Sequence, residues 1–490
     1  ATKNPDLEKP PGPYESIQTA IISRQKIKKM NSTKKVIILT ALFLTTILSG
    51  HAIATYPSPD IAHWDLSISD EKNDPDYQKV RDLVAQKQFA EALAIIGEKI
   101  DSKPREATPE ILKAMVLYEN DEPKKALEAL LTGFKKERQH PALHFAFCQI
   151  HRKLGNGQTS EKACIIAAEQ HRNNPLAHYE FALTLMAKGK AKEADKELLK
   201  SIRLDPKNSK YPYERGMVLN YLNQNDEAEK SFKQAFSLDK NNIEAAYQLA
   251  YLYATKNNKE QALTYINQIL DNHRDKPKAN SAKLLKEYIF KNTTEELPLK
   301  VIPGQYHLNR SKSLYQSKQY GLSIIEGETA ARLSPNDLKV QEILVGIHSM
   351  FLRLDRAEKS VEQFIKSAKD DEKLKSRGYQ EWGDITVLRG HLNKAREMYE
   401  KAKKLGDPNG IAKASLAELP EDVETTERQP LNPNSLFIDP IEALNRKGEI
   451  FAAFGMYQRA LGIYSMVLRM DPSNLTALLN TATANYNNEK

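Results

Sequence analysis

Residues 175–208 read PLAHYEFALTLMAKGKAKEADKELLKSIRLDPKN and contain the pattern that decides the fold. Apolar and small side chains recur at helical spacing before Gly189 and again after it, so this stretch predicts two amphipathic helices joined by a short turn. Pro206 ends the second helix, because proline has no backbone N–H with which to continue it. The apolar faces are carried by Phe181, Ala182, Leu185, Ala194, Leu198 and Ser201.

The same helix–turn–helix pattern returns along much of the chain with a period of about 34 residues. The closing segments LDP at 204–206 and LDK at 238–240 lie one such period apart, and MDP at 470–472 closes a later copy. A period of this length marks a stack of small units, each of which buries its apolar face against its neighbours. Such stacks bind other molecules along a surface, so the period predicts the architecture better than it predicts the partner.

Small and aromatic residues stand at matching places in several copies. They are Gly216, Ala228, Phe232 and Ala235; Ala250, Tyr253 and Ala262; Trp382, Gly383, Gly390, Ala395, Tyr399 and Ala402; and Gly448, Phe451, Gly455, Ala460, Tyr464 and Pro472. This pattern resembles the tetratricopeptide repeat family. The resemblance implies an all-α, right-handed solenoid of antiparallel helix pairs, with about ten repeats and two breaks. One copy departs from the pattern, because Ser311 and Ser323 stand where glycine and alanine are usual.

The repeat register divides the chain into segments. Copies start near 73, 107, 141, 175, 209 and 243, and a partial unit completes a first array over 73–291. A break at 292–303 precedes a second array over 304–409, a proline-rich linker over 410–440 and a last repeat with a terminal helix over 441–490. Residues 1–29 are expected to be an upstream or disordered segment, and 55–72 a flexible N-terminus of the mature chain.

Residues 1–54 carry +5 of the formal net charge of +8, which leaves only +3 for the rest of the chain. A repeat array so close to neutral gives little support to nucleic-acid binding. Residues 30–54 read MNSTKKVIILTALFLTTILSGHAIA. Their cationic start, short apolar run and small final residues are typical of a secretory signal. This segment predicts export to the periplasm or cell envelope, with Lys34 and Lys35 left inside and the repeats outside.

The end of this signal is compatible with two outcomes. Cleavage after Ala54 would make Thr55 the first residue, with Ala52 and Ala54 as the small residues that such sites require. An uncleaved anchor stays possible, because the apolar stretch over 36–54 nearly reaches the length of about 20 residues that a membrane helix needs. Membrane contact is expected only through residues 36–54, and only if they are not removed.

Aromatic residues recur at one place in the first helix of four consecutive copies. In the tetratricopeptide family the first helices line the concave face, where extended peptides or partner helices bind. Flat rings with hydroxyl tips suit a peptide and, by stacking, also a sugar ring. The same rings could instead pack between neighbouring first helices without contacting a partner. The candidate partner-binding residues are Phe145, Tyr179, Tyr213 and Tyr247, each one period from the last, together with Tyr221 and Tyr251.

The two cysteines, Cys148 and Cys164, fall on the first and second helices of one copy. These helices should pack together, and export would place them in an oxidising compartment, so a disulfide is a candidate. Two separate buried thiols are the alternative, because packed helices often hold their Cα atoms too far apart to bridge.

Histidines are enriched in the same region, where His144 and His151 lie two turns apart on one helix face. Such a pair could hold a metal ion. However, His144 and His178 are one repeat period apart, at a place where the family often has an aromatic residue. A structural role is therefore the better interpretation, and no metal site is predicted.

The sequence contains no phosphate-binding loop, zinc-protease or serine-hydrolase motif. Glu180, Glu214 and Glu244 are expected on solvated helix faces, which is the usual place of charged residues. The chain is therefore expected to be non-enzymatic, with no catalytic residues and no cofactor.

The resemblance implies a scaffold that binds proteins or peptides on the concave face of the repeats. Export would place this scaffold in a machine for secretion, pilus or surface-polysaccharide assembly. The alternative is a glycan-guiding periplasmic module of an exopolysaccharide exporter, in which the tyrosines contact polysaccharide. In that case the sequence could be a fragment that lacks a C-terminal β-barrel.

Overall fold

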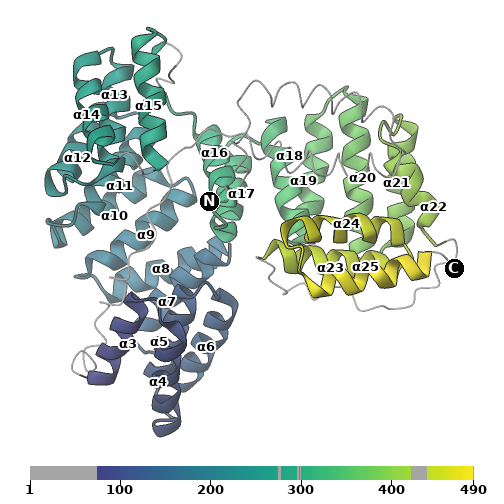
Figure 1. Cartoon of the computed structure of the whole chain (residues 1–490), viewed down its shortest axis with the longest axis horizontal. Helices are drawn as coiled ribbons and strands as arrows, with labels where there is room; N and C mark the ends of the chain where they lie inside the picture. The colour runs from purple at the N-terminus through teal and green to yellow at the C-terminus, as the bar shows by residue number, and fades with distance from the viewer. Residues whose placement is uncertain (1–73, 274–276, 295–296, 298–299, 421–438, 489–490) are drawn as a thin grey trace, which may run out of the picture. The chain divides into compact units, whose positions relative to one another are not determined.

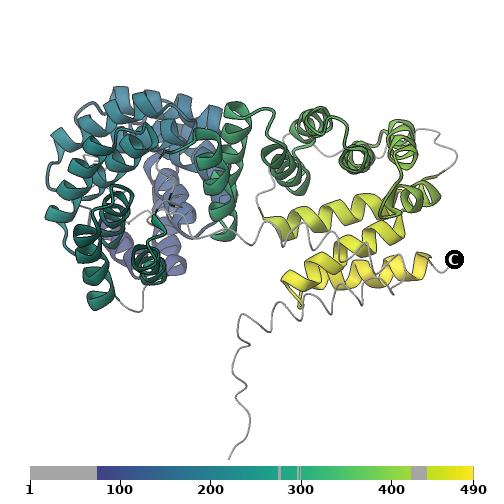
Figure 2. The same ribbon diagram turned by 90° about the horizontal axis from the view of Figure 1, so that it is seen from above.

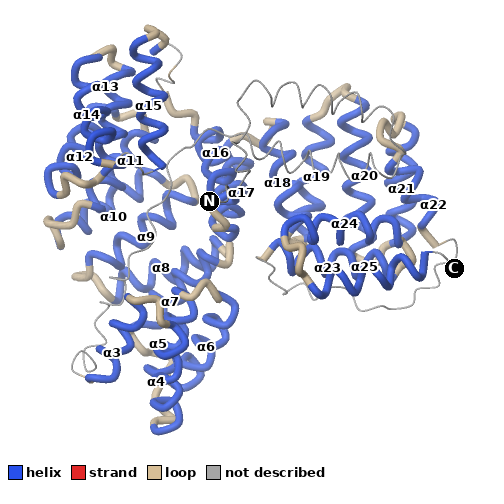
Figure 3. The backbone as a smooth tube through the Cα atoms, in the orientation of Figure 1, coloured by secondary structure: helices blue, strands red, loops and turns tan. Residues whose placement is uncertain are grey.

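The computed structural model describes residues 74–273, 277–294, 297, 300–420 and 439–488. Every regular element in these residues is a helix, drawn in blue in Figure 3, which confirms the predicted all-α fold class. None of the helices in the described ranges is long and apolar enough to cross a membrane. The predicted signal, with Ala52, Ala54 and Thr55, lies outside the described residues.

The chain divides into two units, residues 50–347 and a second that includes residues 348–490. The first unit contains α3 (Pro75–Ala85), α4 (Phe89–Ser102), α5 (Thr108–Glu119), α6 (Pro123–Lys136), α7 (Ala142–Lys153), α8 (Gly157–Gln170), α9 (Pro175–Ala187), α10 (Ala191–Leu204), α11 (Lys210–Tyr221), α12 (Asn225–Leu238), α13 (Ile243–Thr255), α14 (Lys259–Asn272), α15 (Pro277–Phe290), α16 (Pro303–Gln316) and α17 (Tyr320–Leu333). Helix α18 (Leu338–Met350) crosses the boundary between the units. The second unit continues with α19 (Leu354–Ser367), α20 (Glu372–Leu388), α21 (Leu392–Lys404), α22 (Ile411–Glu418), α23 (Pro440–Ala453), α24 (Tyr457–Met470) and α25 (Leu475–Asn488).

Several first helices begin at a short polar residue followed by proline. Asn174 shows the arrangement, because its side chain accepts a hydrogen bond from the N–H of Leu176 at 2.9 Å and Pro175 opens the helix. A proline at this place loses no helical hydrogen bond, since the first N–H groups of a helix have no partner within it. Asp74 and Asp439 cap α3 and α23 in the same way.

The two helices of a pair approach closely where one carries glycine and the other an aromatic ring. A Cβ atom added to Gly216 would lie 2.5 Å from the ring of Phe232, and the same contact is repeated by Gly383 with Tyr399 and by Gly448 with Tyr464. Each ring follows its glycine at the same separation in the sequence, and each is buried. The small residues recognised in the sequence are therefore required by the close packing of the two helices.

The pair α16–α17 replaces this contact with hydrogen bonds. The hydroxyl of Ser311 donates to the carbonyl oxygen of Ser323 at 2.7 Å, and the hydroxyl of Ser323 donates to the carbonyl oxygen of Ser311 at 2.8 Å. Both serines are fully buried. Because each buried hydroxyl has a partner, the unusual residues of this copy cost little stability and keep the helices close together.

One segment differs from the sequence prediction. The sequence predicts a linker over 410–440, but α22 occupies residues 411–418 within it. Asp407 caps this helix by accepting from the N–H of Lys413 at 2.9 Å, and Glu418 at its end accepts from the N–H of Gln458 at 2.7 Å. The repeat pattern does not reveal this helix because it is only 8 residues long and its C-terminal end is fixed by the contact of Glu418 with a later copy.

In the first unit the helix stack curves until distant copies meet. Helix α17 packs against α7 and α9, as Figures 1 and 2 show from two directions. The repeat pattern predicts contacts between neighbouring copies only, so it gave no sign of this return. The return places the pair α16–α17 at the edge of the candidate binding face.

Candidate partner-binding face

The predicted aromatic residues lie on four successive first helices of the first unit. Phe145 is on α7, Tyr179 on α9, Tyr213 and Tyr221 on α11, and Tyr247 and Tyr251 on α13. Their environments differ strongly, and they form two groups. Phe145, Tyr179, Tyr213 and Tyr221 are buried, whereas Tyr247 and Tyr251 are half-buried.

Rings in the buried group pack against other side chains of the array. Tyr179 lies with its ring centroid 5.3 Å from that of Tyr211, and Tyr213 lies 6.0 Å from Phe232. Phe145 packs in a cluster with Ala167 of the second helix. These contacts give the three rings a part in stability, whatever they do in binding.

Tyr221 is covered by α16. Its ring centroid lies 5.0 Å from that of Tyr306, and its hydroxyl lies 3.1 Å from Nε2 of His307. Burial and the neighbouring charge of Glu326 are among the causes that raise the pKa of Tyr221 to about 12. The segment that covers this tyrosine therefore belongs to the chain itself.

The half-buried group carries a charged neighbour. The ammonium of Lys278, on α15, lies 4.7 Å from the ring centroid of Tyr247 and 2.7 Å from a carboxylate oxygen of Glu244. Burial raises the pKa values of Tyr247 and Tyr251 to about 12, so both hydroxyls stay protonated at neutral pH. The face of α13 and α15 thus combines aromatic rings, hydroxyl groups that can donate, and a paired lysine and glutamate.

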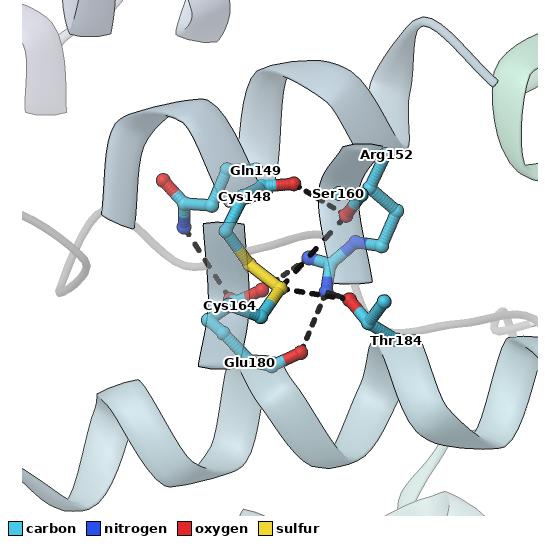
Figure 4. Close-up of a disulfide and its surroundings, with 7 residues drawn as sticks. All are labelled: Cys148, Gln149, Arg152, Ser160, Cys164, Glu180 and Thr184. Carbon is cyan, nitrogen blue, oxygen red and sulfur yellow. Dashed lines mark hydrogen bonds and ion pairs between the residues drawn. A yellow bond between two sulfur atoms is a disulfide. The ribbon is translucent and has the colours of Figure 1, made fainter. Parts of the chain in front are cut away.

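The expectation that three acidic residues lie on solvated faces is wrong for two of them. Glu180 is buried and forms an ion pair with the guanidinium of Arg152, which also donates to the Glu180 carbonyl oxygen at 3.2 Å (Figure 4). Glu214 is buried as well, whereas Glu244 is partly exposed. Helical spacing placed these residues on first helices, but the neighbouring copies that bury them are not visible in a local pattern.

Burial raises the pKa of Glu214 to about 7, although the positive charge of Arg310 opposes the shift. Because this pKa is higher in the folded than in the unfolded chain, the folded state gains stability from the protonated acid and loses it as the pH rises from 4.5 to 7. Between pH 5 and pH 8, we expect the free energy of unfolding of the Glu214→Gln variant to fall by about 2 kcal/mol less than that of the unaltered protein. Urea denaturation at both pH values checks this, and equal pH dependence in the two proteins would contradict it.

The two cysteines are joined in the structure. A disulfide links Cys148 and Cys164, whose Cα atoms are 4.9 Å apart, and both residues are buried (Figure 4). They stand two repeat lengths before Gly216 and Phe232, so the bond occupies the place where another copy packs glycine against a ring. The hydroxyl of Ser160 donates to the carbonyl oxygen of Cys148 at 2.7 Å beside it.

Of the histidines in this region, His178 is hydrogen-bonded within the protein on both ring nitrogens. Nδ1 of His178 lies 2.7 Å from a carboxylate oxygen of Glu197, and Nε2 lies 3.0 Å from the carbonyl oxygen of Arg172. Burial lowers the pKa values of His144 and His151. Among the residues with a described position, no group of three or more metal-binding side chains is present.

Two family models match the chain. Both describe a tetratricopeptide repeat, and they match residues 176–208 and 221–284. These matches confirm the resemblance predicted from the repeat landmarks. No curated protein sequence matches the chain.

Similar solved structures are repeat proteins as well. YrrB, a TPR protein with an unusual peptide-binding site, is 21% identical, with 39% of this chain and 97% of YrrB covered and a TM-score of 0.33. PilF of Pseudomonas aeruginosa is 15% identical, with 48% and 96% covered and a TM-score of 0.32. The TPR domain of P58(IPK) is 13% identical, with 84% and 97% covered and a TM-score of 0.23.

Proposed function

Since the chain is a tetratricopeptide-repeat protein, we propose that it is a non-enzymatic scaffold that binds partner proteins or peptides on the face of α13 and α15. Tetratricopeptide domains are in general protein-interaction scaffolds. The observation that carries the proposal is the half-buried pair Tyr247 and Tyr251 beside the ion pair of Lys278 and Glu244.

This arrangement suits a peptide for a physical reason. Tyrosine presents a large apolar ring that loses little conformational entropy on binding, and its protonated hydroxyl can donate to a peptide carbonyl. The partly exposed carboxylate of Glu244, which is held by the buried Lys278, offers an acceptor at the same place. Tyrosine is among the residues that contribute most to binding energy in protein interfaces.

The proposal includes export to the cell envelope, where the scaffold would serve an assembly machine for secretion, pili or surface polysaccharide. The signal-like sequence of residues 30–54 supports export, and so does the disulfide of Cys148 and Cys164, because such bonds persist mainly outside the cytosol. When cells are quenched with acid and the protein is then unfolded without reductant, we expect both cysteines to resist alkylation, and we expect them to react in a variant that lacks residues 36–48. Reactive thiols in the unaltered protein would contradict export.

Capture of partners tests the binding face. We expect residues 55–490 to retain a defined set of envelope proteins, and we expect Tyr247→Ala with Tyr251→Ala to weaken their binding at least tenfold, or about 1.4 kcal/mol. Mass spectrometry identifies the captured proteins, and a titration with the purified partner gives the affinity.

A matched control separates binding from stability. Tyr265 is also half-buried but lies on the second helix α14, where its ring stacks 6.0 Å from Tyr253. Tyr265→Ala should lower the melting temperature and leave capture unchanged. Equal capture by the double variant, or retention of polysaccharide without protein, would contradict the proposed function.

A further inference from the structure

The pair α16–α17 makes direct contact with the turns of two earlier copies. A Cβ atom added to Gly321, the second residue of α17, would lie 1.8 Å from the carbonyl oxygen of Lys153 at the end of α7. One added to Gly157, the first residue of α8, would lie 3.3 Å from the side chain of Ile325. At Gly321 the two backbones touch, so no side chain can be accommodated there without moving the helices apart.

Side chains of α17 bind the end of α9. The hydroxyl of Thr329 donates to the carbonyl oxygen of Ala187 at 2.8 Å, and the guanidinium of Arg332 donates to the carbonyl oxygen of Lys188. The last carbonyl groups of a helix have no partner within that helix. These donors therefore recognise a helix end through its backbone, without depending on the side chains of α9.

A second contact lies at the end of α11. The side-chain amide of Asn223 donates to the carbonyl oxygen of Val301 at 3.2 Å and accepts from the N–H of Val301 at 2.8 Å. The rings of Tyr306 and His307 cover Tyr221 next to it. Here one side-chain amide bonds both backbone groups of a single residue, and an aromatic ring lies beside it. The same arrangement can bind an extended peptide segment of another chain.

Buried charges fix the hairpin itself. Glu326 of α17 accepts from Nε of Arg310 at 2.8 Å and is paired with His307, so the rigid unit is formed between α16 and α17. The hairpin contacts the end of α9 through a hydrogen bond to backbone, α11 through an aromatic cluster and α7 through the close approach of Gly321, while Val301, which precedes the hairpin, is bonded by Asn223. The ion pairs that join α16 to α17 lie within the hairpin and do not involve the turns.

We propose that the α16–α17 hairpin is an internal latch: it covers the edge formed by Lys153, Ala187, Tyr221 and Asn223, and it must detach before a partner segment of the same chemistry binds there. Such a segment carries hydroxyl or guanidinium donors and an aromatic residue, as the hairpin does. This inference goes beyond the proposed function, because it concerns a second surface, at the ends of α7, α9 and α11, rather than the face of α13 and α15.

Opening of the latch is tested in the full chain with Gly321→Ala. The added methyl group collides with the Lys153 backbone, so amide hydrogen exchange over residues 320–333 should become at least tenfold faster than in the unaltered protein. Gly97→Ala is the control, because nothing lies within 4 Å of its added Cβ atom, and it should leave exchange unchanged. Thr329→Val, which removes one hydrogen bond without a collision, serves as the milder second variant.

A synthetic peptide of residues 301–333 is the binding probe. We expect it to bind the Gly321→Ala chain at least tenfold more tightly than the unaltered chain, whose edge is already covered. Unchanged exchange in both variants, or equal binding of the peptide to open and closed chains, would overturn the latch. Neither result concerns capture through Tyr247 and Tyr251. The latch hypothesis and the proposed function can therefore fail independently of each other.

Discussion

Replacement of Arg152 by methionine is expected to lower the free energy of unfolding of the first unit by about 3–5 kcal/mol. The guanidinium of Arg152 is paired with Glu180 in a place where the two side chains are 9% and 2% exposed. The substitution removes the cation and leaves an unpaired carboxylate in a poorly solvated site. An unpaired buried charge is the main cause of the stability lost when a buried ion pair is broken. Urea denaturation measures the loss.

The control for this prediction removes both charges. In Arg152→Met with Glu180→Leu no buried charge is left behind, so most of the stability should return. A single substitution that costs less than about 1 kcal/mol would place this pair in the class of solvated ion pairs and contradict its burial.

Reduction of the disulfide is the second large effect that we expect. The bond closes a segment of the chain with a sequence separation of 16, and opening a loop of this size costs about 3 kcal/mol. The midpoint of thermal unfolding should therefore fall when a reductant is added. In Cys148→Ala with Cys164→Ala the reductant should have no effect, and an unaltered midpoint in the unmodified protein would show that the bond does not stabilise the fold.

The repeat architecture was predictable because each copy encodes it locally. Glycine on the first helix and a ring at a fixed place on the second, as in Gly383 and Tyr399, specify the crossing of two helices through their own sizes. The cysteine pair has the same sequence separation, so the sequence contained a signal for the close approach of Cys148 and Cys164. Comparison of copies, rather than inspection of one copy, reveals this signal.

Features that depend on distant copies were not predictable in this way. The burial of Glu214 and the covering of Tyr221 by Tyr306 involve contacts that the repeat period does not describe. Periodicity identifies which face of a helix is apolar, but it does not state which later segment returns to cover a polar face. The six aromatic residues were therefore predicted as a set, but their division into buried and half-buried members was not predicted.

A photo-crosslinking aromatic amino acid at position 251 tests the central claim most directly. Tyr251 lies on the proposed binding face, whereas Gln268 is exposed on α14 and provides the comparison position. The account predicts cross-links to one or a few envelope proteins from position 251 and none from position 268. Cross-links from position 268 alone, or from both positions to the same proteins, would contradict a partner-binding face on α13 and α15.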